Sequence, residues 1–162
     1  MSQLLCLAKR CEEAISHLKA IVNADPGLYF AHQSLGTAYL ALGRYKEALD
    51  SYHAAEKIQS NEFIVGLLAN AHARAGNRVE AEMHWKQLQQ LRQSGAPNAA
   101  GFAFAAAAMR TKEEAINWLL RACQDREDTM TWVGSEPIFD PLRSHPRYAE
   151  VLQCTGVTPL RR

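Results

Sequence analysis

The segment EEAISHL at residues 12–18 recurs three times along the chain, as KEALDSY at 46–52, VEAEMHW at 79–85 and EEAINWL at 113–119. Each copy carries an alanine at its third position, and successive alanines lie 34, 33 and 34 positions apart: Ala14, Ala48, Ala81 and Ala115. A fixed period in this range is typical of proteins built from stacked helical units. The repeated segment therefore predicts one architecture for the whole chain.

Each repeated segment forms the second half of a unit with two apolar stripes at helical spacing. In the best-formed unit the first stripe holds Phe30, Leu35, Ala38, Tyr39 and Leu42, and the second holds Tyr45, Ala48, Leu49, Tyr52 and Ala55. Gly43 lies between the stripes, where a glycine in the left-handed conformation ends a helix. Gly76 has the same place in the next unit. The pattern predicts a helix, a tight turn and a second helix in each unit.

Small residues recur where the two helices of a unit must approach each other. Gly36 and its counterparts Ala69 and Ala103 lie on the first helices, and the repeated alanines lie on the second helices. We expect the first helix to cross the second at these positions, with Tyr52, Trp85 and Leu119 covering the seam.

The composition excludes several functional classes. The 162 residues hold 18 Lys and Arg against 17 Asp and Glu, which gives a formal charge of +1. This balance lacks the basic field that binding to a nucleic-acid backbone requires. No apolar stretch approaches the roughly 20 residues that span a bilayer, and the first residues lack the features of a secretory signal. The sequence predicts a soluble, cytoplasmic protein that contacts neither membranes nor nucleic acid.

Chemistry-bearing motifs are missing from the sequence. It contains no GxSxG, phosphate-binding loop or Gly-rich dinucleotide turn, so we expect no catalytic residues and no cofactor. The six histidines form neither HExxH nor an i, i+4 pair, so we expect no metal site. The four cysteines, which have no CxxC partner, are predicted to be reduced thiols and mostly buried: Cys6, Cys11, Cys123 and Cys154.

With these residues in place, the array resembles the tetratricopeptide repeat family, whose 34-residue unit is a helix hairpin. The unit at 29–62 matches best, with Leu35, Gly36, Tyr39, Ala48, Tyr52 and Ala55 at the family's positions. His72 and Ala106 depart from the pattern in later units. The resemblance implies an all-α, right-handed superhelical solenoid of antiparallel hairpins, with about three and a half to four repeats. Its units are 1–28 (incomplete), 29–62, 63–96 and 97–127.

The tail at 128–162 is predicted to cap the array. EPIFDPLRSHPRYAEVLQCTGV at 136–157 looks like the closing segment of tetratricopeptide regions in large bacterial signalling and regulatory proteins. Asp140-Pro141 and His145-Pro146 indicate two short helix starts. We expect the apolar residues of the tail to cover the last open face: Phe139, Leu142, Tyr148, Val151 and Leu152.

The resemblance implies that the first helices line a concave groove, the usual binding surface of such arrays. It assigns nine residues to this groove: Phe30, Gln33, Thr37, Leu40, Phe63, Leu67, Asn70, Arg74 and Phe104. Rings, amides and a single arginine suit a peptide or partner protein anchored by apolar side chains. The groove lacks the several cations that hold a chaperone's terminal carboxylate in some members of the family. The function expected is therefore a non-catalytic scaffold for protein–protein interaction.

An alternative function is a regulatory or self-association module, as a fragment of a larger bacterial protein. Leu4, Leu5 and Leu7 lie on the short leading helix of the incomplete unit and would leave an uncapped apolar edge. Terminal units of a solenoid normally carry a polar outer face. This edge predicts either a homo-oligomer or a covering segment upstream, and a small molecule remains open as a ligand of the groove.

Overall fold

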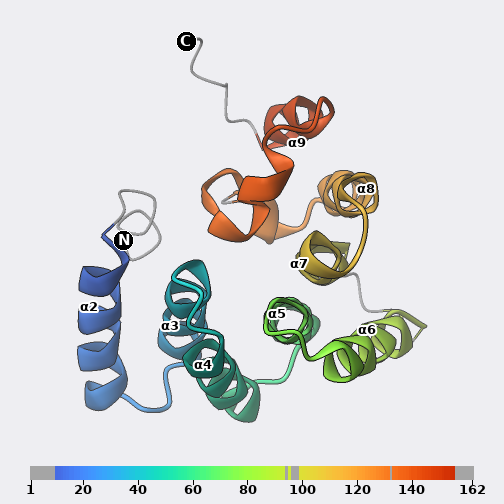
Figure 1. Ribbon diagram of the computed structural model, residues 1–162. Coiled ribbons are helices and arrows are strands. Elements are labelled where there is room, and N and C mark those ends of the chain that lie inside the picture. Colours follow the sequence, from blue (N-terminus) through green and yellow to red (C-terminus); the bar gives the residue numbers. More distant parts are fainter. Residues whose placement is uncertain (1–9, 94, 96–98, 132, 156–162) are drawn as a thin grey trace.

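The protein is all-α in the computed structural model, which describes residues 10–93, 95, 99–131 and 133–155. No strand occurs within these ranges. The helices follow an arc, and short 3₁₀ turns lie on its inner side (Figure 1). The α-helices are α2 (Cys11–Ala24), α3 (Tyr29–Ala41), α4 (Tyr45–Ile58), α5 (Glu62–Arg74), α6 (Arg78–Gln93), α7 (Ala99–Met109), α8 (Lys112–Gln124) and α9 (Tyr148–Cys154). The 3₁₀ turns are η1 (Asp128–Thr131), η2 (Val133–Ser135) and η3 (Pro137–Leu142).

Consecutive helices form the expected hairpins, α3 with α4, α5 with α6, and α7 with α8. The first two hairpins turn at Gly43 and Gly76, whose φ angles of 72° and 84° lie in the left-handed region that glycine adopts without strain. Side chains bind the free N–H groups at several helix N-termini, including that of α7, where the Glu127 carboxylate accepts from Ala99 and Ala100. The Oδ1 atom of Asn61 accepts a hydrogen bond from the Ile64 N–H at 2.9 Å, and Thr111 caps α8 in the same way.

The crossing of α3 and α4 depends on a glycine beneath a tyrosine ring. Gly36 and Tyr52 are both buried. A Cβ atom at Gly36 would lie 2.5 Å from Cδ1 and Cε1 of Tyr52. The Tyr52 hydroxyl meets the Thr37 hydroxyl at 3.1 Å, which holds the ring in place from its other end. The helix crossing therefore has the small residue where the repeat pattern predicts it.

Gly36→Leu should destabilise the protein by about 1–3 kcal/mol or more, because the added side chain overfills a well-packed crossing. Urea unfolding monitored by circular dichroism measures this change. Ala41→Leu is the matched control, since Ala41 is exposed on the same helix, and its effect should stay within about 0.5 kcal/mol. Equal stability of Gly36→Leu and the parent protein would contradict the crossing.

The second and third hairpins, α5/α6 and α7/α8, are joined by an unusually close contact between α5 and α7. Gly66 of α5 is buried, and a Cβ atom there would lie 2.8 Å from Cα of Gly101 on α7 and closer still to its carbonyl oxygen. The backbones of these two helices thus touch directly. By contrast, α6 contacts α7 only sparsely. The first helices are drawn together, while the second helices α6 and α8 stand apart.

The tail follows a path that differs from a simple end cap. α9 packs on α8 of the last hairpin, and η3 contacts both helices of that hairpin and also reaches back to α3. Figure 1 shows η2 and η3 inside the arc. Ile138, Phe139 and Leu142 are all buried there. The expectation of a cap is therefore incomplete, because the first half of the tail fills the inner face of the array.

The expectation of reduced cysteines is wrong. A disulfide joins Cys123 of α8 to Cys154 of α9, with Cα atoms 6.2 Å apart, a separation typical of disulfides. Cys11 is disulfide-bonded as well. The packing of α9 on α8 brings together two cysteines 31 positions apart, which the spacing within each helix cannot indicate. Since disulfides persist in oxidising compartments, the cysteines give no support to residence in a reducing one.

None of the helices described by the structure is long and apolar enough to cross a lipid bilayer.

Candidate functional site

The inner face of the array is closed over most of its length. Gln33, Thr37 and Leu40 of α3 are at most 5% exposed, and Leu67, Asn70 and Phe104 are fully buried. The expectation that Thr37, Leu40, Leu67, Asn70 and Phe104 line an open groove is therefore wrong, whereas Gln33 keeps a small exposed part at the open end of this face. The reason is that the tail lies over this face, and that α5 and α7 approach each other closely enough to bury the groups between them.

Specific contacts hold the tail in the groove. The ring of Phe139 packs on that of Phe104 with centroids 4.8 Å apart. Nη2 of Arg74 donates a hydrogen bond to the Ile138 carbonyl at 3.2 Å. Nδ2 of Asn70 donates to the Phe104 carbonyl at 2.7 Å, which ties α5 to α7 beneath the tail. Arg74 and Asn70, predicted as ligand-binding residues, thus bind the protein's own backbone.

A carboxyl group is buried beside this segment. Glu136 immediately precedes η3 and is 1% exposed. Removal from water disfavours the charged form and raises the pKa of Glu136 to about 7. Burial also raises the pKa of the nearby Tyr52 hydroxyl, and the charge of Glu136 adds to that rise. The inner face is therefore an apolar environment that favours a neutral Glu136.

One end of the inner face stays open, around Phe30. This side chain is 70% exposed at the start of α3, and its ring meets that of Tyr29 edge to face with centroids 5.2 Å apart. Phe63 is half-buried nearby and packs against Phe104. A cleft of about 330 Å³ lies here, lined by Tyr29, Phe30, Gln33, Gln59, Asn61, Phe63, Asp128 and Thr129. We call it the Phe30 cleft.

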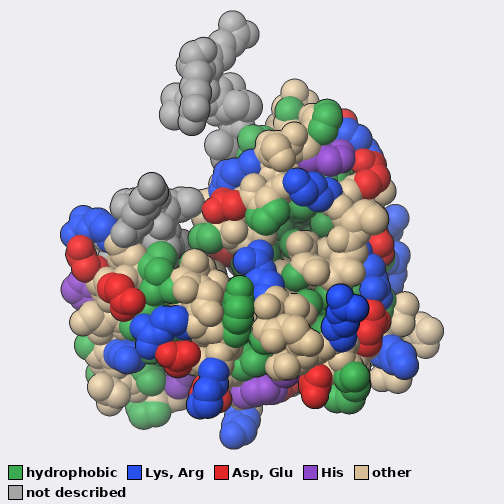
Figure 2. Space-filling model, in the orientation of Figure 1, with side chains coloured by type: hydrophobic (Ala, Val, Ile, Leu, Met, Phe, Trp, Pro, Cys, Tyr) green, Lys and Arg blue, Asp and Glu red, His purple; other side chains and the backbone are tan. Residues whose placement is uncertain are grey.

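The Phe30 cleft combines aromatic rings with amide and hydroxyl groups, and among its described lining residues Asp128 alone is charged. Over the face of the molecule in Figure 2, acidic and basic side chains are interspersed, and neither sign gathers in a large patch. Since the formal net charge is also only +1, we expect recognition in the Phe30 cleft to depend on local contacts.

The residues predicted to form a self-association edge are Leu4, Leu5 and Leu7. They lie outside the residues that the structure describes.

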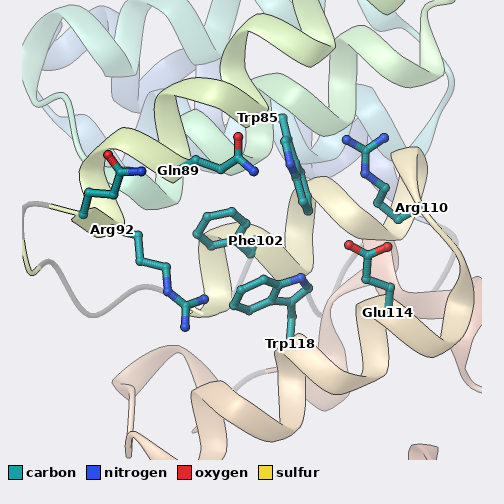
Figure 3. Close-up of a pocket in the computed structure, with 8 residues that line it drawn as sticks. Trp85, Gln89, Arg92, Phe102, Arg110, Glu114 and Trp118 are labelled. Carbon is teal, nitrogen blue, oxygen red and sulfur yellow. The ribbon is translucent and has the colours of Figure 1, made fainter.

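A second cleft of about 710 Å³ opens between α6, α7 and α8. Its aromatic wall is formed by Trp85, Phe102 and Trp118. The Phe102 ring stacks on Trp118 with centroids 4.4 Å apart and meets Trp85 edge to face at 5.2 Å. Figure 3 shows Phe102 between the two indoles. We call this site the tryptophan cleft.

The tryptophan cleft lies on the opposite side of α7 from the tail. Phe104 contacts the tail, and Phe102, two residues earlier, projects from the other face of the helix. The cleft exists because α6 and α8 stand apart where α5 and α7 are in contact.

Charged groups flank the aromatic wall of the tryptophan cleft. The guanidinium carbon of Arg92 lies 4.7 Å from the Trp118 centroid, and that of Arg110 lies 4.5 Å from the Trp85 centroid. Arg92 is at one end, and Arg110 and Glu114 are at the other (Figure 3). Arg110 is bound by both carboxylate oxygens of Glu82, at 2.8 and 3.0 Å. Among the described residues, no carboxylate forms an ion pair with Arg92 and no cation forms one with Glu114.

Three histidines gather on the neighbouring helices α4, α5 and α6. The rings of His72 and His84 stack with centroids 5.4 Å apart, and His53 lies 6.1 Å from His72. Burial lowers the pKa of both His72 and His84, with neighbouring histidines adding to the effect. Within the described part of the chain, no group of His, Cys, Asp and Glu has a geometry that could hold a metal ion.

The residues of the tryptophan cleft were not predicted as a site, although the sequence holds a signal for one of them. Trp118 aligns with Ser51 and His84 in the repeated segments, so a large ring replaces a smaller group there. Arg92 carries no comparable signal, because it is one of many charged residues on a helix surface.

A scan against protein-family models finds no match to this chain, and a search of curated proteins finds none either. The tetratricopeptide resemblance therefore depends on the repeated residues alone.

Proposed function

We propose that the protein is a non-catalytic interaction module with a tetratricopeptide-like solenoid fold, and that it binds a segment of a partner protein in the Phe30 cleft. The observation that carries this proposal is the exposure of the Phe30 ring, 70%, at the open end of an otherwise filled inner face. A large ring left in water beside a cleft offers apolar surface that a partner's side chain can bury.

The lining of the Phe30 cleft favours a particular ligand chemistry. Phe30 and Phe63 offer aromatic surface, which suits a large apolar side chain as the anchor. The exposed amide of Gln59 offers a donor and an acceptor for a peptide backbone. Asp128 at the rim favours a basic residue beside the anchor and disfavours an acidic one. We therefore propose an apolar segment with a neutral or basic flank.

Phe30→Ala should weaken binding of peptides selected from a displayed random library by about tenfold or more, since truncation of an aromatic anchor costs about 2 kcal/mol. Isothermal titration of the selected peptides against the parent protein and the variant gives the affinities. The variant should keep its stability within about 0.5 kcal/mol, because the side chain is exposed.

Val79→Ala is the matched control, because Val79 is 72% exposed on α6 and lies outside the Phe30 cleft. Its affinities should equal those of the parent protein. Selected peptides that bind Phe30→Ala as tightly as the parent protein would contradict the proposal, as would a library that yields no binder.

A further inference from the structure

The tryptophan cleft has features of a second binding site, separate from the Phe30 cleft. Its wall combines two indoles and a phenyl ring, and Arg92 at one end has no ion-pair partner among the described residues. At the other end Glu114 lies beside Arg110, whose guanidinium is already bound by Glu82, so this end keeps an excess of negative charge. Structural ion pairs elsewhere on the same helices are closed, as Arg110 with Glu82 shows. Arg92 therefore differs from Arg110, whose donors are bound by a carboxylate.

The position of Arg92 suits it to bind a carboxylate. Its guanidinium lies over the face of Trp118, at 4.7 Å, and is 5.8 Å from the Phe102 centroid. A guanidinium held over an aromatic ring loses less freedom on binding and keeps its donor edge open for a bidentate contact. A carboxylate is the planar acceptor that matches this fork.

We infer that the tryptophan cleft binds a peptide segment of a partner protein in which one aromatic or large apolar side chain is flanked by an acidic residue on one side and a basic residue on the other. The apolar side chain packs beside Trp118, which is the half-buried ring of the wall, because Trp85 and Phe102 are only 7% and 2% exposed. The acidic residue meets Arg92, and the basic residue meets Glu114. The cleft volume of about 710 Å³ is ample for one large side chain and parts of its neighbours.

The test uses two blocked pentapeptides of defined sequence on the full chain. One is acetyl-Glu-Gly-Phe-Gly-Lys-amide, and the other is its uncharged counterpart, acetyl-Gln-Gly-Phe-Gly-Gln-amide. Nitrogen-15 NMR follows the indole N–H signals of Trp85 and Trp118 during each titration. The charged peptide should move both signals in a saturable way, and the uncharged peptide should bind about tenfold more weakly.

Arg92→Gln should weaken binding of the charged peptide about tenfold, and Arg92→Lys should fall between this variant and the parent protein because it keeps the charge but loses the planar fork. Glu114→Gln should weaken binding as well. Lys86→Gln is the matched control, since it removes one positive charge from an exposed position of α6 outside the cleft. Binding to Lys86→Gln and to Phe30→Ala should equal binding to the parent protein.

Several results would overturn the inference. These are the absence of saturable shifts at either indole, equal affinity for the charged and uncharged peptides, and equal losses in Arg92→Gln and Lys86→Gln. Loss of the indole shifts in Phe30→Ala would also overturn it, because the peptide would then bind at the other cleft.

Discussion

Gly66→Ala should lower the free energy of unfolding by about 3 kcal/mol or more, although it adds a single methyl group. Alanine favours a helix over glycine by roughly 0.5–1 kcal/mol, so the local effect is stabilising. The methyl carbon, however, would lie 2.8 Å from Cα of Gly101, against backbone that has no flexible end to move aside. Helices α5 and α7 must then separate, which exposes Leu67 and Phe104 between them.

Gly134→Ala is the matched control for this substitution. A Cβ atom there would meet only Cδ2 of Leu152, at 3.4 Å, and this side chain can shift. Its effect should stay within about 0.5 kcal/mol. Urea unfolding of the three proteins gives the comparison, and equal stabilities of Gly66→Ala and Gly134→Ala would mean that α5 and α7 do not touch as described.

Glu136→Gln should stabilise the protein at pH 8 by up to about 3 kcal/mol and leave its stability at pH 4.5 little changed. Burial raises the pKa of Glu136 from 4.5 to about 7. Between these values the folded protein keeps a proton that the unfolded chain has lost, so the stability of the parent protein falls as the pH rises. Above pH 7 this loss of stability is complete, and a pKa shift of this size corresponds to roughly 3 kcal/mol. Glu136→Gln avoids the loss, because the glutamine amide is neutral at every pH.

The lowered pKa values of His72 and His84 act in the opposite direction. In the folded protein these two histidines stay neutral at pH values where they are protonated in the unfolded chain. They therefore lower the stability of the protein as the pH falls below about 6.5. For this reason the informative quantity is the difference between Glu136→Gln and the parent protein at each pH, because the histidines cancel in it. Urea unfolding at pH 5, 6, 7 and 8 measures that difference.

Glu150→Gln is the control, because Glu150 is exposed in α9. It should follow the parent protein's pH dependence to within about 0.5 kcal/mol. If Glu136→Gln also follows it, the Glu136 carboxyl is ionised in the folded protein at pH 7, and its burial has no consequence for titration.

The all-helical fold and its hairpins could be predicted from the sequence. The repeated alanines predict the units, and Gly43 and Gly76 predict the turns, because these features depend on residues close together in the chain. Gly36 and Tyr52 were also predictable as a crossing, since both belong to the same hairpin. The spacing of residues along the chain is sufficient to predict a contact wherever both residues belong to the same unit.

The candidate site was harder to predict from the sequence, because it depends on contacts between segments that are far apart in the chain. Nothing near Asn70 in the sequence shows that its amide will donate to the Phe104 carbonyl, or that Phe139 will cover Phe104. The same residue type at the same repeat position can lie in an open groove or be buried. Which of the two occurs depends on whether the tail covers that position, and the repeat spacing does not predict the path of the tail.

The tryptophan cleft was missed for a related reason. It depends on the divergence of α6 and α8, which follows from the contact of Gly66 with Gly101 on two other helices. The sequence marks Trp118 as unusual, but it does not indicate that a cleft lies beside it.

The course of the tail also bears on how the molecule unfolds. An array whose units contact only their neighbours can fray from either end, one unit at a time. Here the bond from Arg74 to Ile138 spans 64 positions, and η3 reaches α3 near the start of the chain. These contacts link early and late units into one cooperative body. They also delay completion of the fold until the chain has closed a long loop, so folding should be slower than in an open array of the same length.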